Sequence, residues 1–109
     1  VSKVHYPMIE EHPSHQQAKA LFKAGSWLLS FELDDSEGCL QVVDKLKVFV
    51  KATGLGDTRS LIIPVAPTIF WEMGEKKRAD MNIEDGLVRI SIGLEESSVL
   101  IADLEQALS

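Results

Sequence analysis

Asp85-Gly-Leu-Val-Arg-Ile-Ser-Ile-Gly-Leu-Glu95 contains the clearest strand signal in the chain. The alternation within it predicts a β-strand over residues 87–92, because successive side chains of a strand point to opposite faces of a sheet. One face carries Val88, Ile90 and Ile92, and the other carries Leu87, Arg89 and Ser91. We expect the apolar face to pack beneath helices.

The second face places the guanidinium group of Arg89 in the middle of a sheet. A mid-strand arginine lies either on a solvated or salt-bridged face or against an anionic partner. Periodicity alone favours neither interpretation. Arg89 is nevertheless a candidate ligand-binding residue, because a planar guanidinium can form a two-point, charge-assisted pair with a carboxylate.

Further elements follow from the same reasoning on each side of this strand. Residues 27–33 (WLLSFEL) and 59–63 (RSLII) are predicted strands. Apolar spacing predicts four helices. The first starts after Ser14, with Gln17 as its capping-box partner, and stops before Gly25, and the second runs from Glu37 to about Ala52 behind an Asp34-Asp35-Ser36 turn. The third is short, at 75–81, and the last is capped by Ser97 or Ser98. Residues 1–13 are expected to be extended. Three strands and several helices predict an α/β fold of the α+β type, a two-layer sandwich with a small, mostly antiparallel sheet and helices on one face.

Composition narrows the functional classes. The chain has 109 residues, which suits a single domain over residues 1–109, and its net charge of −6 without a basic stripe argues against nucleic-acid binding. No apolar run reaches the length of a membrane span, and the single cysteine, Cys39, fits a reducing compartment. We therefore expect a cytoplasmic protein that contacts neither nucleic acid nor membrane.

Several segments occur in the order typical of one enzyme family. They are Val4-His-Tyr-Pro7 with His12-Pro13, Leu28-Leu-Ser-Phe-Glu-Leu33, Leu55-Gly-Asp57 with Ser60-Leu61, Asp85–Glu95 and Leu100–Leu108. Together they resemble the C-terminal part of the Cys/Met-metabolism, or trans-sulfuration, family of pyridoxal-phosphate enzymes. That family includes cystathionine γ-synthase, cystathionine lyases, methionine γ-lyase and O-acetylhomoserine sulfhydrylase.

The resemblance implies a fold, a site and partners. The fold is the C-terminal small domain of an aspartate-aminotransferase-like (fold type I) enzyme, whose large domain carries pyridoxal 5′-phosphate. Arg89 would bind the substrate α-carboxylate, with Gly54, Leu55 and Ser60 near the site. The resemblance also implies a parent enzyme that is a homotetramer and acts on sulfur amino acids or activated homoserine by β or γ elimination or replacement.

The chain departs from the family pattern near this site. Gly54 stands where the family commonly has serine, and Pro64-Val65-Ala66 and Thr68-Ile69-Phe70 replace its His-Pro-Ala and Met-Thr-His. No lysine lies in a Ser-x-Thr-Lys setting, so we expect no catalytic residue in this chain and no cofactor on the isolated chain. Phe70 and Trp71 are interpreted as packing residues, with a pocket or interface as the alternative.

Other candidate residues have simpler interpretations. The three histidines, His5, His12 and His15, lack a spacing typical of metal ligands. No general base lies at a diagnostic spacing from Cys39, so we expect this cysteine to be a small buried apolar residue. Glu95 and Glu96 favour a helix start, and Lys76-Lys77-Arg78 is expected to be a solvated helix face. A non-catalytic α+β module that binds a carboxylate ligand or a partner protein stays open as the alternative function.

Overall fold

Strand β5 (Leu87–Ser91) lies in the middle of a five-stranded sheet. The computed structural model describes residues 1–109. The other strands are β1 (Lys3–His5), β2 (Leu28–Glu32), β3 (Val50–Lys51) and β4 (Leu61–Pro64), and their order across the sheet is β1-β2-β5-β4-β3. All neighbouring strands are antiparallel except β3 and β4, which are parallel. The predicted small, mostly antiparallel sheet is confirmed.

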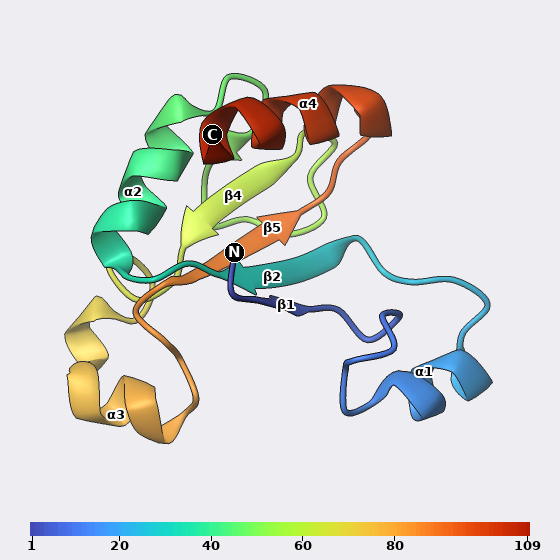
Figure 1. The fold of residues 1–109 in the computed structure, drawn as a ribbon, viewed down its shortest axis with the longest axis horizontal. Helices are drawn as coiled ribbons and strands as arrows, with labels where there is room; N and C mark the ends of the chain where they lie inside the picture. The colour runs from blue at the N-terminus through green and yellow to red at the C-terminus, as the bar shows by residue number, and fades with distance from the viewer.

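Two helices cover one face of this sheet: α2 (Ser36–Lys45) and α4 (Ser97–Leu108), which lie side by side above the strands in Figure 1. The core lies between these helices and the sheet, and it contains Phe31, Cys39, Val43, Phe49, Ile62, Val88, Ile90 and Leu100. Helices α1 (His15–Leu21) and α3 (Glu75–Asp80) lie at opposite ends of the molecule beyond the other face (Figure 1), and the 3₁₀ turn η1 (Trp71–Met73) precedes α3. The two-layer α+β architecture is therefore confirmed. None of the helices is long and apolar enough to span a bilayer.

The sequence predicted three strands, and the structure has five. Strand β1 falls in the segment expected to be merely extended, and β3 falls inside the helix predicted from Glu37 to Ala52, which ends instead at Lys45. The helix stops because Leu46 adopts an extended conformation, with ψ of 140°. Val50 and Lys51 then join the sheet as its edge strand, where Val50 pairs with Leu61 and Lys51 with Ile62.

The N-terminal caps of α1, α2 and α4 agree only in part with the predicted ones. Asp35 caps α2 as expected, since its carboxylate accepts a hydrogen bond from the Gly38 N–H at 2.7 Å. Ser14 does precede α1, but its side chain makes no capping hydrogen bond, so the predicted capping box is wrong. The cap of α4 is Glu96 rather than Ser97 or Ser98, because the helix already begins at Ser97 and both serines lie inside it.

A buried carboxylate holds the connection between α2 and β3. Asp103 of α4 accepts hydrogen bonds from the backbone N–H groups of Lys47 (2.9 Å), Val48 (2.8 Å) and Phe49 (3.2 Å). These N–H groups lie between two regular elements and have no ladder partner, so the carboxylate replaces one. Burial alone would raise the pKa of Asp103, but the three N–H donors outweigh it and lower the pKa.

Replacing Asp103 by asparagine should destabilise the fold. Asparagine keeps one acceptor oxygen but presents an NH₂ group to the remaining donors, so we expect a loss of about 1–3 kcal/mol at pH 7, the cost of leaving buried donors unpaired. Because the folded pKa is depressed, the stabilisation is complete above the unfolded value of about 4 and is lost as the pH falls through the folded value. Urea unfolding should show a difference between the two proteins that shrinks below pH 4. A difference that is the same at pH 7 and pH 3 would contradict this account.

The prediction that Cys39 is a small buried apolar residue is confirmed. Its side chain is 0% exposed, within the core. Burial, reinforced by the nearby carboxylate of Asp35, raises the pKa of the Cys39 thiol to about 11. The thiol is therefore protonated and shielded at neutral pH, which makes it a poor nucleophile.

A thiol reagent should accordingly distinguish folded from unfolded chain. We expect Ellman's reagent at pH 8 to label Cys39 slowly without denaturant and completely within minutes in concentrated guanidinium chloride. Fast stoichiometric labelling of the folded chain would show that the α2 side of the core is open. Circular dichroism recorded in parallel controls for unfolding by the reagent.

Candidate functional site

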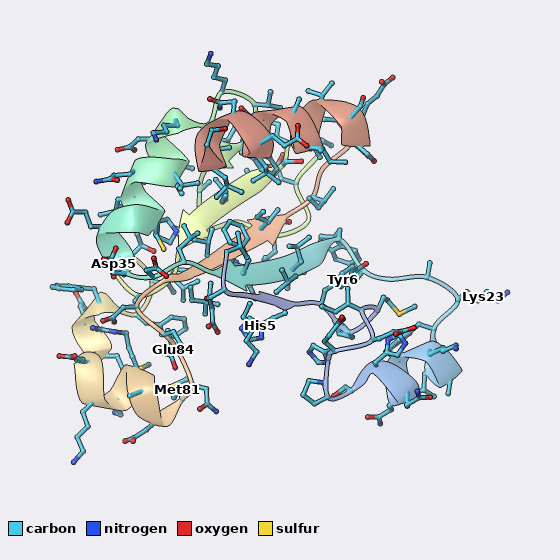
Figure 2. All side chains as sticks on the ribbon, viewed as in Figure 1. His5, Tyr6, Lys23, Asp35, Met81 and Glu84 are labelled. Carbon is cyan, nitrogen blue, oxygen red and sulfur yellow. The ribbon has the colours of Figure 1, made fainter.

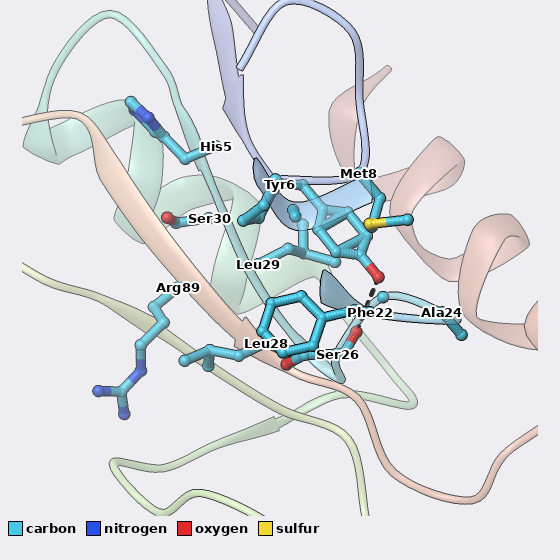
Figure 3. Close-up of a pocket in the computed structure, with 13 residues that line it drawn as sticks. His5, Tyr6, Met8, Phe22, Ala24, Ser26, Leu28, Leu29, Ser30 and Arg89 are labelled. Carbon is cyan, nitrogen blue, oxygen red and sulfur yellow. Dashed lines mark hydrogen bonds between the residues drawn. The ribbon is translucent and has the colours of Figure 1, made fainter. Parts of the chain in front are cut away.

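Arg89 lies on the sheet face opposite α2 and α4. It is paired with Ser30 of β2 on one side and Ile63 of β4 on the other, and Ser30 is in turn paired with His5 of β1. Side chains that are directly opposite in neighbouring strands lie on the same face, so these residues form a row across the sheet. Figure 3 shows His5, Ser30 and Arg89 projecting to the same side of the strands. The predicted orientation of Arg89, away from the apolar core, is confirmed.

The guanidinium group of Arg89 is free of acidic partners. Its Nη2 donates a hydrogen bond to the carbonyl oxygen of Thr53 at 2.6 Å. The other two arginines both lie within 4.0 Å of an aspartate: Arg59 faces Asp57 at 3.4 Å, and Arg78 faces Asp85 at 3.9 Å. Arg89 therefore keeps most of its donors available while one contact fixes its direction.

The loop between β3 and β4 passes next to Arg89. It contains Gly54 and Leu55, which are both exposed, and Gly56, which has φ of +72°, a value that suits glycine. The backbone N–H of Gly56 donates to the hydroxyl of Ser91 at 3.2 Å. The structure thus brings Gly54 and Leu55 close to Arg89. Two hydrogen bonds connect this loop to β5: one between Thr53 and Arg89, and one between Gly56 and Ser91.

Ser60, the fourth residue predicted at the site, is the last residue of this loop before β4 and is 0% exposed. Its hydroxyl donates to Glu95 at 2.8 Å and accepts from the Gly93 N–H at 2.9 Å. Direct contact between Ser60 and a ligand therefore stays a prediction. No local pattern indicates the contact between Ser60 and Glu95, because the two residues are 35 positions apart. The position of Glu95 indicated only a helix start.

A cavity of about 460 Å³ adjoins this face of the sheet (Figure 3). Its walls come from the segment around Tyr6, from Phe22 after α1, and from Leu28, Ser30 and Arg89 of the sheet. Tyr6 closes one side by donating to the carbonyl oxygen of Ser26 at 2.9 Å. His5, which points away from α2 and α4 in Figure 2, is hydrogen-bonded to the carboxylate of Glu32 at 2.6 Å. The cavity surface is mainly apolar, and Arg89 is the one residue with a charged guanidinium group among those that line it.

The other candidate residues serve the structure. Each histidine has a separate partner: Glu32 for His5, the Ser14 N–H for His12 and the Pro7 carbonyl for His15. No cluster of three or more possible metal ligands is present.

The expectation of a solvated face over 76–78 is correct for Lys76 and Lys77 but wrong for Arg78. Arg78 is buried because its guanidinium lies over the ring of Trp71, 5.4 Å from its centroid, and donates to the carbonyl oxygens of Phe70 and Trp71. Trp71 therefore contacts Arg78 with its ring but is 63% exposed, and Phe70 is half-buried, so the interpretation of these two residues as packing residues holds only in part.

Fold and site together define an α+β domain that presents one unpaired arginine beside a glycine-containing loop. The model of the family described as "Cys/Met metabolism PLP-dependent enzyme" matches residues 1–109. The chain belongs to this family of pyridoxal-phosphate (PLP)-dependent enzymes.

Similar proteins within the family carry out different reactions. The chain is 38% identical to the O-succinylhomoserine sulfhydrylase of Mycobacterium tuberculosis, over 97% of this chain and 27% of the relative. It is 39% identical to the L-methionine gamma-lyase of Fusobacterium nucleatum, over 99% and 28%. The crystal structure of cystathionine gamma synthase from Xanthomonas oryzae in complex with cystathionine superimposes with a TM-score of 0.89 at 37% identity, over 99% of this chain and 28% of that one. The chain thus spans about a quarter of the length of the curated relatives that it matches.

The residues present do not fit a pyridoxal-phosphate site. A site of this kind needs a lysine for the Schiff base, and no lysine lines the cavity beside Arg89. The exposed polar groups next to Arg89 come from one loop and one strand face.

Gly93 offers a test of how the loop is held. A Cβ atom at this position would lie 2.3 Å from the Thr58 carbonyl oxygen and 2.4 Å from the Arg59 carbonyl carbon, and both are backbone atoms. Gly93→Ala should therefore force the loop away from the end of β5 and lower the free energy of unfolding by about 1–3 kcal/mol. Thermal unfolding followed by circular dichroism measures this. The exposed Ser98→Ala is the control and should leave the melting temperature nearly unchanged; equal effects of the two substitutions would contradict the close approach.

Proposed function

We propose that residues 1–109 form the C-terminal small domain of a longer PLP-dependent enzyme, in which they close over the substrate. The substrate would be a sulfur amino acid or an activated homoserine, and the reaction an elimination or replacement at its β or γ carbon. Family membership and the quarter-length match to sulfhydrylase, lyase and synthase relatives support this assignment. A large domain would bind the cofactor, and we expect the complete enzyme to be a homotetramer.

Arg89 is the observation on which the proposal rests. A guanidinium without an acidic partner, held in the middle of a sheet by one backbone carbonyl, has the donors to bind a carboxylate at two points. The two other arginines already have aspartate neighbours, so Arg89 is the arginine best suited to an external anion. Every α-amino acid brings such an anion as its α-carboxylate.

Binding at Arg89 would orient the substrate. A two-point contact fixes both the position and the rotation of the carboxylate, and so the direction of the neighbouring Cα–H bond. The exposed backbone at Gly54 and Leu55 would flank the carboxylate, while Thr53 holds the guanidinium in place. Pyridoxal phosphate, when bound in the complete enzyme, supplies the electron sink; this chain supplies the orientation and excludes water from one side.

Arg89→Ala in the full-length enzyme tests the proposal. Loss of a charge pair that is shielded from water should lower kcat/KM by a factor that corresponds to about 2–5 kcal/mol of transition-state stabilisation, mainly by raising KM. Cofactor content, measured from the absorbance between 300 and 500 nm, should be retained.

Two further variants sharpen this test. Arg89→Lys should recover part of the loss, since lysine keeps the charge without the planar fork. Lys77→Ala, which removes an exposed positive charge on α3, should behave like the wild type. Unchanged kcat/KM in Arg89→Ala would remove this residue from the site and favour a non-catalytic module.

A further inference from the structure

A second carboxylate, that of Glu95, is bound by two donors of one distant residue. Glu95 Oε2 accepts the backbone N–H of Ser60 at 2.9 Å, and Oε1 accepts the Ser60 hydroxyl at 2.8 Å. The two residues are 35 positions apart in sequence, Ser60 directly before β4 and Glu95 after β5. This pair of hydrogen bonds, here called the Ser60–Glu95 clasp, joins the two chain segments that border the Arg89 site.

The clasp is continued by backbone contacts. The Ser60 hydroxyl oxygen accepts the Gly93 N–H at 2.9 Å, and the Leu94 N–H donates to the carbonyl oxygen of Thr58 at 2.8 Å. Ser60 is fully buried, so its hydroxyl uses both its donor and its acceptor capacity inside the protein. The end of the β3–β4 loop is thereby fixed to the exit of β5.

The exposed part of the loop has little other support. Residues 53–56 are exposed and include Gly54 and Gly56, which lose much conformational freedom when they are ordered. Between β3 and the clasp, the loop is tied to β5 by two contacts: the Thr53 carbonyl with Arg89, and the Gly56 N–H with Ser91. The position of the loop relative to Arg89 therefore depends on where the clasp holds its far end.

We propose that Glu95 and Ser60 are positioning residues for substrate binding, which they support by holding the β3–β4 loop against Arg89 without touching the substrate themselves. This inference rests on the proposed function of Arg89. It assigns Ser60 to the support of the loop and adds Glu95, which lies outside the set of residues predicted at the site. Release of the clasp lets the loop retreat, and Arg89 then loses both its Thr53 contact and the backbone that flanks the carboxylate.

The electrostatics of the clasp agree with this role. Hydrogen bonds from the Ser60 N–H, from the backbone N–H of Glu95 itself and from the Ser60 hydroxyl lower the pKa of Glu95. Partial burial and the nearby Asp57, which itself faces Arg59, oppose this with smaller effects. Glu95 therefore stays ionised at neutral pH, and a charged acceptor binds its two donors more strongly than a neutral one.

Steady-state kinetics of the full-length holoenzyme tests the inference. Glu95→Gln replaces one acceptor oxygen with an NH₂ group that faces a donor, and Ser60→Ala removes the hydroxyl. Each should raise the KM for the amino-acid substrate about tenfold with less than a twofold change in kcat, because the affected binding is the same in ground and transition states. The double variant should show little further loss, since both substitutions break one clasp.

Asp103→Asn is the matched control, because it also breaks carboxylate bonds to a backbone but at residues 47–49 rather than at the site loop. It should lower the melting temperature without raising KM. A KM increase in Glu95→Gln no larger than in Asp103→Asn would overturn the inference. If Arg89→Ala alters KM while the clasp variants do not, only the inference fails; if Arg89→Ala has no effect, the proposed function fails as well.

Discussion

The register of β5 is the constraint on which the rest of the structure depends. This strand is paired on both edges, so that Ile90 faces Leu29 and Ile62 while Arg89 faces Ser30 and Ile63. A shift by one residue would move Arg89 into the core and expose Val88 and Ile90. Exposing those two side chains would cost about 1.5–3 kcal/mol each, and burying an unpaired guanidinium would cost several more. The interactions that form the core therefore also decide which face carries the candidate binding group.

Carboxylates then hold the segments that the sheet does not reach. Asp35, Asp57, Glu95 and Asp103 each accept a backbone N–H at a turn or loop. Such N–H groups lack ladder partners, and an ionised acceptor satisfies them more strongly than a neutral one. Hydrogen bonds lower the pKa values of Asp57, Glu95 and Asp103, so these clamps remain charged at neutral pH. The acidic composition therefore reflects, in part, internal demands of the backbone.

Local patterns made the strands β2 and β5, the helices of the main face and the orientation of Arg89 predictable, since each depends on side-chain alternation within a few residues. The early end of α2 was not predictable in this way, because the N–H groups of residues 47–49 bind Asp103, more than 50 positions away. The Ser60–Glu95 clasp joins residues 35 positions apart, so no local spacing signals it. Arg78 was misplaced for a related reason: its burial depends on Trp71 and on carbonyl groups of the preceding turn rather than on helix periodicity.

A sulfhydrylase, a gamma-lyase and a gamma synthase share these 109 residues at 37–39% identity, although their names denote different reactions. O-succinylhomoserine, methionine and cystathionine are all α-amino acids, so an α-carboxylate is the group that their chemistry has in common. An arginine that binds this common group, as proposed for Arg89, would serve all three reactions. On that proposal, differences in substrate range arise where the surroundings of the carboxylate vary, as at Gly54, where a serine hydroxyl is replaced by bare backbone. Divergence there would alter which amino acid fits, while the β5 register and the Ser60–Glu95 clasp would keep the carboxylate contact in place.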